Sequence, residues 1–289
     1  MGEEAVKKFL MKAAAACAVF GAVFCILGFV LGGKPTGVQL SWENGRPRVE
    51  YKSAGLDELL VGEAPLFSAG RGGENTSGKE QPAQGGSVTF TEELHSMDIE
   101  LGGVQLYLKA GDSWNVTVEN TKKYRAYAEA GVLHVSCFED DLLETAAVFT
   151  VTYPKDALLR EVDIQLGAGS LEAESFVCSE LELEVGAGDA VLQNVEVDRS
   201  CEITVGIGSV ELNGSLLGET GIECGMGNVS CRLYGVEDYD YEVDCGMGSV
   251  RLDDREYSGI AVEDSRRTGA AVRYEIECGM GSVELIHAG

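Results

Sequence analysis

The chain has little positive charge and almost no histidine. Its 289 residues contain 22 Lys and Arg against 48 Asp and Glu, with only three His. This balance repels phosphate backbones and anionic lipid surfaces, and it excludes nucleic acid as a partner. The histidines, His95, His134 and His287, lie far apart in the sequence, and neither a nucleophile elbow nor a phosphate-binding loop is present. We therefore expect a non-enzymatic protein without a cofactor.

Cysteine pairs at zinc-binding spacing are also missing. None of the nine cysteines forms a Cys-x-x-Cys pair. Cys224, Cys245 and Cys278 instead share one alternating position in three repeats, which we place in successive coils. A metal or redox ladder of thiols is one interpretation, although stacked parallel side chains suit disulfide torsions poorly. We favour the simpler interpretation that these thiols pack as small buried apolar groups.

A single long apolar run stands near the N-terminus. It begins at Ala13, ends at Gly32 and contains twenty uncharged residues, enough to cross a bilayer core of roughly 30 Å as a helix. Three lysines precede it, Lys7, Lys8 and Lys12, which predicts a cytoplasmic N-terminus and an extracellular remainder. A cleaved signal peptide is the alternative, but the run exceeds a usual apolar region and no Ala-x-Ala site follows it. Residues 1–33 are thus predicted to be a cytoplasmic tip and a single membrane-spanning helix.

Residues 34–95 are predicted to be a flexible juxtamembrane spacer. The stretch from Gly62 to Gly86 is rich in Gly, Ser, Glu, Gln and Pro and lacks apolar periodicity. Before it, Trp42 and Tyr51 either lie near the membrane interface or belong to a small hairpin around Asn44 and Gly45. The remaining residues, 96–289, carry the repeats and form the predicted main domain.

A Gly-x-Gly tripeptide recurs through this domain. Five of its six copies begin 19, 20, 19 and 21 residues apart, with short apolar alternations on both sides. A period near twenty with strand-type alternation predicts one solenoid turn per repeat. We expect the glycines to flank an inward residue at a corner, because glycine reaches dihedrals that other residues avoid. The corner glycines are Gly167, Gly169, Gly186, Gly188, Gly206, Gly208, Gly225, Gly227, Gly246, Gly248, Gly279 and Gly281.

The alternation assigns residues to an inner and an outer face. Val205 and Cys224 occupy equivalent inward positions one repeat apart. Met226, Met247 and Met280, between their glycines, are also expected inward. A copper-binding stripe is one interpretation of these methionines, and thioethers that fill gaps in the core are the favoured one.

Stacking between repeats must supply most of the stability of such a fold. About five buried aliphatic side chains contribute roughly 1.5–3 kcal/mol each, whereas ordering some twenty residues costs on the order of 1.5 kcal/mol apiece. One coil therefore cannot stand alone. The prediction is an all-β, single-stranded parallel β-solenoid of about six to seven coils, with either winding hand. Strands around Val116 and Ala147 are expected to cap its first end, next to a degenerate first coil at Ile99.

The other end is expected to remain open. The spacing of 33 residues between Gly246 and Gly279 predicts a loop around Asp253 to Gly269. The sequence stops directly after the last coil at Gly289. An uncovered terminal coil offers unpaired backbone, so we expect it to dock a partner protein or a second copy by strand addition.

Acidic residues fall on shared outward positions. One set is Glu184, Glu223, Asp244 and Glu277, and another is Asp163, Glu182, Glu202, Glu242 and Glu275. At an inter-strand spacing of about 4.8 Å such carboxylates repel each other and raise pKa values or recruit cations. The first set is the only candidate for a cation site. A solvated face that prevents aggregation is the favoured interpretation.

Several segments together resemble a known family. They are the lysine-flanked N-terminal helix, Tyr153-Pro154-Lys155-Asp156, the stretch from Glu161 to Leu171, and the repeated Val-Gly-Ala-Gly-Asp and Glu-Cys-Gly-Met-Gly-Ser-Val units. Over roughly residues 95–289 the chain resembles the bacterial putative-adhesin family, a domain of unknown function. The resemblance implies a membrane-anchored β-solenoid on a Gram-positive surface, linked to adhesion or envelope-stress signalling. It implies no catalytic residues.

These observations predict a cell-membrane protein that presents a rigid acidic solenoid as an interaction surface. The alternative is a cation-dependent module that binds glycans or cell-wall polymers. A polysaccharide lyase comes third, because it rests only on the use of β-helices by such enzymes.

Overall fold

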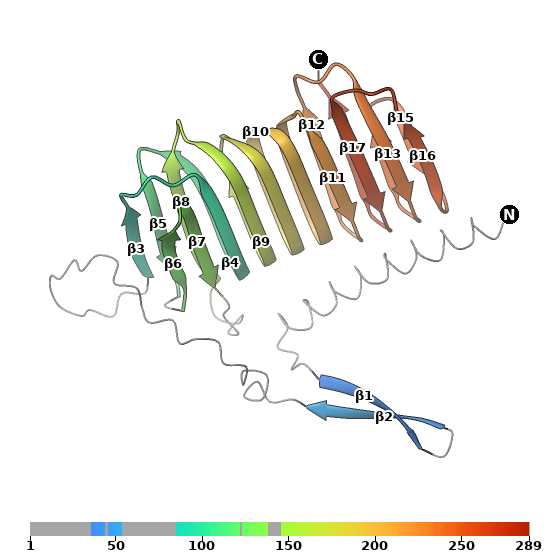
Figure 1. The fold of residues 1–289 in the computed structure, drawn as a ribbon, viewed down its shortest axis with the longest axis horizontal. Coiled ribbons are helices and arrows are strands. Elements are labelled where there is room, and N and C mark those ends of the chain that lie inside the picture. The colour runs from blue at the N-terminus through green and yellow to red at the C-terminus, as the bar shows by residue number, and fades with distance from the viewer. Residues whose placement is uncertain (1–35, 44–45, 54–84, 122, 138–145, 289) are drawn as a thin grey trace.

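The computed structural model describes residues 36–43, 46–53, 85–121, 123–137 and 146–288. Regular structure in these ranges consists of β-strands (Figure 1), which confirms the all-β prediction. None of the described residues belongs to a helix long and apolar enough to cross a bilayer. The predicted membrane segment from Ala13 to Gly32 lies outside them.

Two strands form a sheet of their own. β1 (Thr36–Glu43) and β2 (Arg46–Ser53) pair antiparallel, with Glu43 opposite Arg46 and Thr36 opposite Ser53. This pairing agrees with the hairpin around Asn44 and Gly45, which was one of the two alternatives predicted for this region. All other strands belong to one 16-stranded sheet that begins with β3 (Gly85–Phe90), before the predicted boundary at residue 96.

The large sheet contains long strands in its middle and short ones toward its ends (Figure 1). After β3 they are β4 (Ser96–Gly111), β5 (Trp114–Glu119), β6 (Arg125–Glu129), β7 (Val132–Cys137), β8 (Ala147–Pro154), β9 (Leu158–Ala173), β10 (Phe176–Leu216), β11 (Glu219–Cys224), β12 (Asn228–Leu233), β13 (Tyr239–Cys245), β14 (Ser249–Leu252), β15 (Arg255–Ser258), β16 (Val262–Arg266), β17 (Val272–Cys278) and β18 (Ser282–His287).

Segments before and after each Gly-x-Gly corner form two rows. The first row includes residues 161–166 of β9, 180–185 and 200–205 of β10, and β11, β17 and β13. The second row includes residues 168–173 and 187–192, with β12, β18 and β14. Pairing within each row is parallel, whereas antiparallel pairs occur at both ends. The sheet is therefore mixed and does not close on itself.

Equivalent apolar residues of neighbouring repeats stack in the core. Val205 pairs with Cys224, Cys224 with Cys278, and Cys278 with Cys245. All four side chains are buried, and the seven cysteines of the described residues are free thiols. The predicted inward column exists, and its thiols pack among apolar groups as expected.

The order of the strands differs from their order in the chain. β17 lies between β11 and β13, and β18 lies between β12 and β14. The prediction that Cys224, Cys245 and Cys278 follow one another in successive coils was therefore wrong, because Cys278 is the middle one. β4 is likewise inserted between β9 and the pair β7 and β8. In both cases the inserted strands, β4 at one end of the sheet and β17 and β18 at the other, pair with strands on both of their sides.

The predicted loop from Asp253 to Gly269 instead contributes two strands that cover one end. β15 pairs antiparallel with β14, and β16 with β13. The predicted open C-terminal coil was wrong, since β17 and β18 have strand neighbours on both sides. Strand addition at this coil therefore has no free backbone to use. At the opposite end β5 and β6 complete the sheet beyond β8 and β7, as the cap prediction required, whereas β3 comes from the stretch predicted to be a flexible spacer and pairs with β5.

A network of tyrosines and one carboxylate closes the core beneath β15 and β16. Tyr241 and Tyr257 donate hydrogen bonds to Asp264 Oδ2 at 3.0 and 2.9 Å. Both tyrosines are buried, and Arg255 lies 5.3 Å from the centre of the Tyr241 ring. The stack of aliphatic side chains ends here. Through the network, the buried phenol groups of Tyr241 and Tyr257 find hydrogen-bond partners at this end of the core.

The residue between the two glycines points outward rather than inward. Ile207 and Met226 are 38% and 39% exposed, and Met280 and Met247 are 49% and 64% exposed. The predicted inward methionines were therefore wrong. At the corner of β10, Val205 and Gly206 are both buried, which shifts the alternation by one residue before Val210 resumes the inner face. Strict period-two counting through a corner thus assigns the wrong face.

The corner glycines serve two different needs. Gly208 has φ of 139°, in the region that residues with a Cβ rarely adopt. Gly281 has no such dihedral, but a Cβ there would lie 2.1 Å from the carbonyl oxygen of Gly227 and 2.7 Å from Cys224 Sγ. The thiol of Cys224 therefore packs against the bare Cα of the neighbouring repeat.

Candidate functional site

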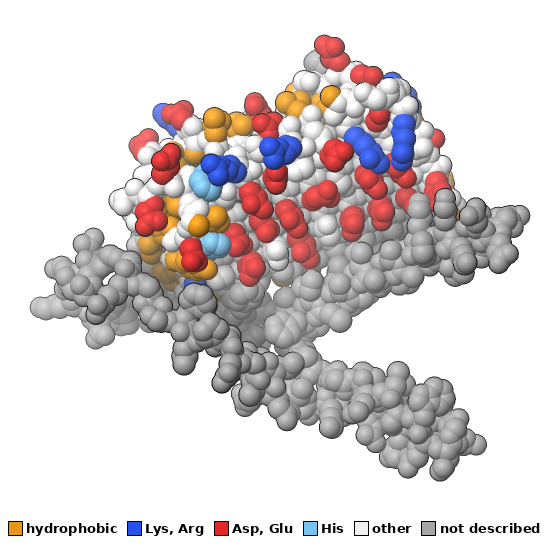
Figure 2. All heavy atoms as spheres, in the orientation of Figure 1, with side chains coloured by type: hydrophobic (Ala, Val, Ile, Leu, Met, Phe, Trp, Pro, Cys, Tyr) orange, Lys and Arg blue, Asp and Glu red, His pale blue; other side chains and the backbone are white. Residues whose placement is uncertain are grey.

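The first row of strands presents a broad acidic surface, which we call the acid face. Figure 2 shows red carboxylates spread over it, with Lys and Arg mostly toward the upper ends of the strands. The outward positions of β9, β10, β11, β17 and β13 supply these carboxylates, since alternate residues of a strand point to opposite sides. The acid face is the candidate functional site.

The strand register arranges the acid face in columns. The columns are Glu100, Gln165, Glu184, Thr204, Glu223, Glu277 and Asp244, and alongside it Asp98, Asp163, Glu182, Glu202, Gly221, Glu275 and Glu242. The four predicted cation candidates share the first column. Thr204 separates Glu184 from Glu223, and Glu277 rather than Asp244 is the neighbour of Glu223.

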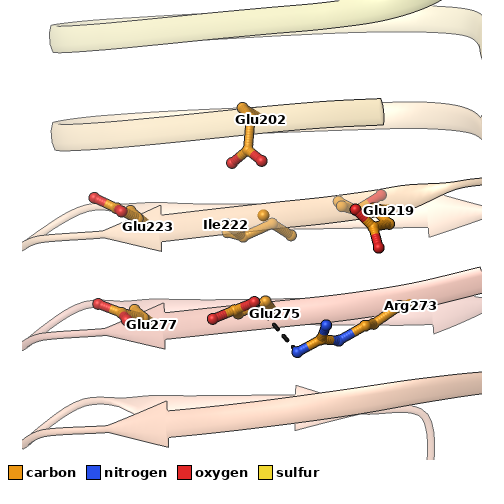
Figure 3. Close-up of a pocket in the computed structure, with 9 residues that line it drawn as sticks. Glu202, Glu219, Ile222, Glu223, Arg273, Glu275 and Glu277 are labelled. Atoms are coloured by element: carbon orange, nitrogen blue, oxygen red, sulfur yellow. Dashed lines mark hydrogen bonds and ion pairs between the residues drawn. The ribbon is translucent and has the colours of Figure 1, made fainter. Parts of the chain in front are cut away.

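A hollow interrupts the second column at Gly221, a residue that sequence reasoning overlooked. A Cβ on Gly221 would overlap with the carboxylate of Glu202, because the Glu202 side chain lies over the glycine. The hollow has a volume of about 140 Å³, and Figure 3 shows carboxylates on several sides of it. Its charged lining consists of Glu202, Glu219, Glu223, Arg273, Glu275 and Glu277.

Few cations offset this surface. Arg273 lies beside the hollow, with its Nη2 3.3 Å from Glu242 and 3.5 Å from Glu275. Arg267 pairs with the same Glu242 at 2.7 Å, and both arginines are partly exposed. Exposed pairs of this kind contribute about 0–1 kcal/mol each. The acid face therefore keeps a negative potential around the hollow.

Burial and mutual repulsion raise the pKa values of several of these carboxyls. Burial, followed by the charges of Glu182 and Asp98, raises the pKa of Asp163 to about 6. Burial also raises the pKa of Glu202, with Glu223 as the next cause, and that of Glu184, with Glu182 as the next cause. Asp163 Oδ1 is buried without a hydrogen-bond partner. Folding thus disfavours the ionised form of these groups.

Mild acid should therefore stabilise the protein. Because the folded pKa of Asp163 is above its ordinary value, the ionised group destabilises the fold at pH 7, and protonation as the pH falls through 6 relieves this. We expect the melting temperature to rise by about 2–4 °C between pH 7 and pH 5. This is the shift that ~1 kcal/mol produces in a chain of this size, a figure reduced for solvent screening because Asp163 is only partly buried. Calorimetry across this range measures it.

The variant Asp163→Asn isolates the cause. It should be more stable than the wild type at pH 7 and should show a flatter dependence on pH. Glu211→Gln changes an exposed carboxylate of the second row, and it should leave the slope as it is. A melting temperature that falls steadily from pH 7 to pH 5 would contradict the assignment.

The three histidines lie toward the two ends of the sheet. His95, directly before β4, and His134, in β7, share one end, where the His95 amide donates to the Gly131 carbonyl at 2.9 Å. His134 Nδ1 is 2.7 Å from Asp98 Oδ2 near one end. His287 stands at the other end, with Nδ1 3.0 Å from Asp253 Oδ1 and Nε2 3.0 Å from the hydroxyl of Tyr274. Tyr274 is fully buried, so a substrate has no access to it. This Asp-His-Tyr arrangement ties β18 to the strands around it.

The acid face does not gather a convergent set of metal ligands. In the part of the chain that the structure describes, no three His, Cys, Asp or Glu side chains surround a point where a metal ion could sit. A column of carboxylates on neighbouring strands spreads charge along a surface instead of concentrating it. The geometry therefore suits an extended cationic partner better than a single hard cation.

Comparisons with known proteins found likeness in structure alone. No family model matches the sequence, and no curated protein matches it. Similar solved structures include a "putative cell adhesion protein" from Clostridium sporogenes ATCC 15579, which is 14% identical with a TM-score of 0.45. The match covers 71% of this chain and 99% of that one.

Two further similar structures are one with an adhesin name and one with a lipid-binding name. A "putative adhesin" from Bacteroides fragilis NCTC 9343 is 12% identical with a TM-score of 0.43, and the match covers 69% of this chain and 96% of that one. A "Putative lipid binding protein" from Parabacteroides distasonis ATCC 8503 is 14% identical with a TM-score of 0.30, covering 71% and 98%. At these scores the membership of this chain in the adhesin family stays a prediction.

Proposed function

We propose that this protein is a non-enzymatic, membrane-anchored surface protein that uses its acid face to dock a cationic partner at the cell envelope. The observation that carries the proposal is the pair of carboxylate columns, which run across neighbouring strands from β4 to β13. A rigid surface of one charge sign attracts an extended partner of opposite sign and orients it before contact. Adhesion and envelope-stress signalling both depend on binding a partner, which such a surface serves.

The anchor and the outer location belong to the same proposal. The apolar run from Ala13 to Gly32 would hold the chain in the membrane, with the lysines before it on the cytoplasmic side. Residues 34–84 would link the anchor to the main domain, since the large sheet begins with β3 at Gly85 and not at the predicted boundary of residue 96. Membership in the putative-adhesin family, in a Gram-positive organism, is supported by the sequence motifs.

The finer architecture is proposed as well. In-register parallel pairing within two rows, with repeats of about twenty residues, supports a β-solenoid whose ends are closed by antiparallel strands. Such a frame keeps the columns straight, since each repeat is held by its neighbours on both sides. A cation-dependent glycan module is not carried forward, because the described residues offer no convergent ligand set.

Cell attachment tests the function. Cells that display the full chain should attach to a surface coated with a cationic protein, and the triple variant Glu202→Gln, Glu223→Gln and Glu277→Gln should lose most of this attachment. These changes neutralise the rim of the hollow without altering side-chain size. The difference in attachment between the wild type and the triple variant should become smaller as salt is added, because exposed charges are screened over about 8–10 Å.

A variant of β9 and β10 at positions outside the acid face is the matched control. Glu172→Gln, Glu196→Gln and Glu211→Gln remove the same charge from exposed positions outside the acid face. It should attach as the wild type does. Equal attachment by the two triple variants would show that net charge alone is responsible and would overturn the proposed docking face.

A further inference from the structure

Three methionines lie next to one another on the outside of the molecule. The Met280 amide donates to the Gly225 carbonyl at 2.8 Å, and the Met247 amide donates to the Gly279 carbonyl at 2.7 Å. These bonds place Met226, Met280 and Met247 on consecutive strands, in this order. Neighbouring Cα atoms in such a ladder are about 4.8 Å apart.

Core packing does not explain these side chains. Met226, Met280 and Met247 are 39%, 49% and 64% exposed, so their thioethers face solvent. The equivalent place in earlier repeats holds Ala187 or Ile207. Methionine has three rotatable bonds, and the two outer side chains can lean toward Met280 until all three sulfurs contact one ion.

The charge beside the methionines favours a cation. Glu223, Glu277 and Asp244 stand three residues before the respective methionines, on the edge of the acid face next to the corner. Figure 3 shows Glu223 and Glu277 side by side near the ends of β11 and β17. Carboxylates at this distance raise the local concentration of positive ions. Neutral thioether sulfur is a soft ligand and selects Cu(I) over hard ions such as Ca²⁺.

The thiols of the same strands are directed elsewhere. Cys224, Cys278 and Cys245 are at most 3% exposed and point into the core. Cys224 Sγ donates to the carbonyl of Gly227 at 3.2 Å. The outer ligand set therefore consists of three thioethers.

We propose that Met226, Met280 and Met247 form a three-thioether site for one soft monovalent cation of the Cu(I) type. The site is separate from the docking function of the acid face and shares only its negative potential. It forms no bond other than sulfur to metal, so the oxidation state of the ion does not change. Ag(I), which is stable in air, is the practical probe.

The test follows methionine methyl groups by NMR. The full chain in detergent is labelled with ¹³C at its methionine methyls and titrated with silver nitrate in chloride-free buffer. We expect the signals of Met226, Met280 and Met247 to shift together and to saturate at one Ag(I) per chain. The signal of Met97, which is buried, should stay in place.

Single substitutions then test whether the three act as one site. Met280→Leu keeps an apolar side chain of similar volume but removes the central ligand, and it should weaken binding on the order of 10–100-fold, as read from the two remaining signals of Met226 and Met247. Ile207→Leu is the matched control and should not change the affinity. An unchanged melting temperature in both variants shows that the fold is intact.

Two outcomes would overturn the site. Silver that binds without moving any methionine signal would be held by thiols. Methionine signals that shift independently, with Met280→Leu leaving the silver response of Met226 and Met247 unchanged, would show three unrelated weak contacts. Calcium nitrate at equal concentration should move none of the three signals.

Discussion

Replacing Gly208 by alanine should destabilise the protein by about 4 kcal/mol or more, a loss that ordinary substitutions do not reach. The new Cβ would lie in the place of the Gly188 carbonyl oxygen in the preceding repeat. The backbone at Gly208 also has φ of 139°, which alanine adopts only with strain. The corner cannot open without separating strands on both of its sides. Chemical denaturation of the wild type and the variant measures the difference.

Gly269 offers a matched control for the strain alone. It too has a positive φ, of 88°, but nothing lies within 4 Å of a Cβ built on it. Gly269→Ala should cost only about 1–2 kcal/mol, the price of the left-handed conformation. If the two variants lose the same stability, close stacking of the repeats is not what requires glycine at the corners.

A chain that ends at Gly269 should fail to fold at the end where β13 to β16 lie. β17 and β18 occupy the places between β11 and β13 and between β12 and β14. Their removal leaves apolar faces and unpaired backbone on both sides of the gap. We expect trypsin to cleave after Arg251 and Arg255 as fast as in the denatured chain, whereas the full chain resists.

Deletion of β3 provides the comparison for this truncation. β3 is an outer strand with β5 as its pairing partner, so its loss removes one edge of the sheet. Protection at Arg251 should then remain. If the truncated chain kept this protection as well, β13 would stack on β11 as the chain order suggests, and the inserted position of β17 would be wrong.

Sequence alternation predicted which face of a straight strand segment is buried. Leu181, Leu183 and Val185 are inward as expected, and the carboxylates between them are outward. These assignments hold because side chains of a strand alternate with a period of two. The columns of the acid face follow from the same rule and from the regular spacing of the repeats.

The orientation of the corner residues and the spatial order of the last repeats were predicted wrongly, each for a physical reason. At Gly206 the backbone bends, and the period of two does not continue through a bend, so Ile207 and the three methionines were placed on the wrong face. The three last repeats share the tetrapeptide Cys-Gly-Met-Gly. Their local patterns fit in either order, and contacts outside the tetrapeptide distinguish them, such as the pairing of β15 and β16 with β14 and β13 and the ion pair between Arg251 and Glu284.

The hollow on the acid face could have been predicted from the sequence by the glycine at position 221, which an inspection of the acidic residues alone does not reveal. Gly221 stands at an outward strand position where the repeats on either side carry Glu202 and Glu275. A glycine inside a strand marks a close approach or a missing side chain. Stacked acidic positions, Asp163 among them, predicted raised pKa values from mutual repulsion, but burial by neighbouring repeats is the larger cause at Asp163 and had no such sequence signal.

The inserted position of β17 and β18 governs when this end of the molecule can form. β13 and β14 leave the ribosome before β17 and β18 do, yet their parallel partners are those later strands. During synthesis, residues 239–266 must therefore wait without their final parallel neighbours β17 and β18. This end should mature after translation of residue 287, and the delay gives a chaperone a period in which to hold this part of the chain unfolded.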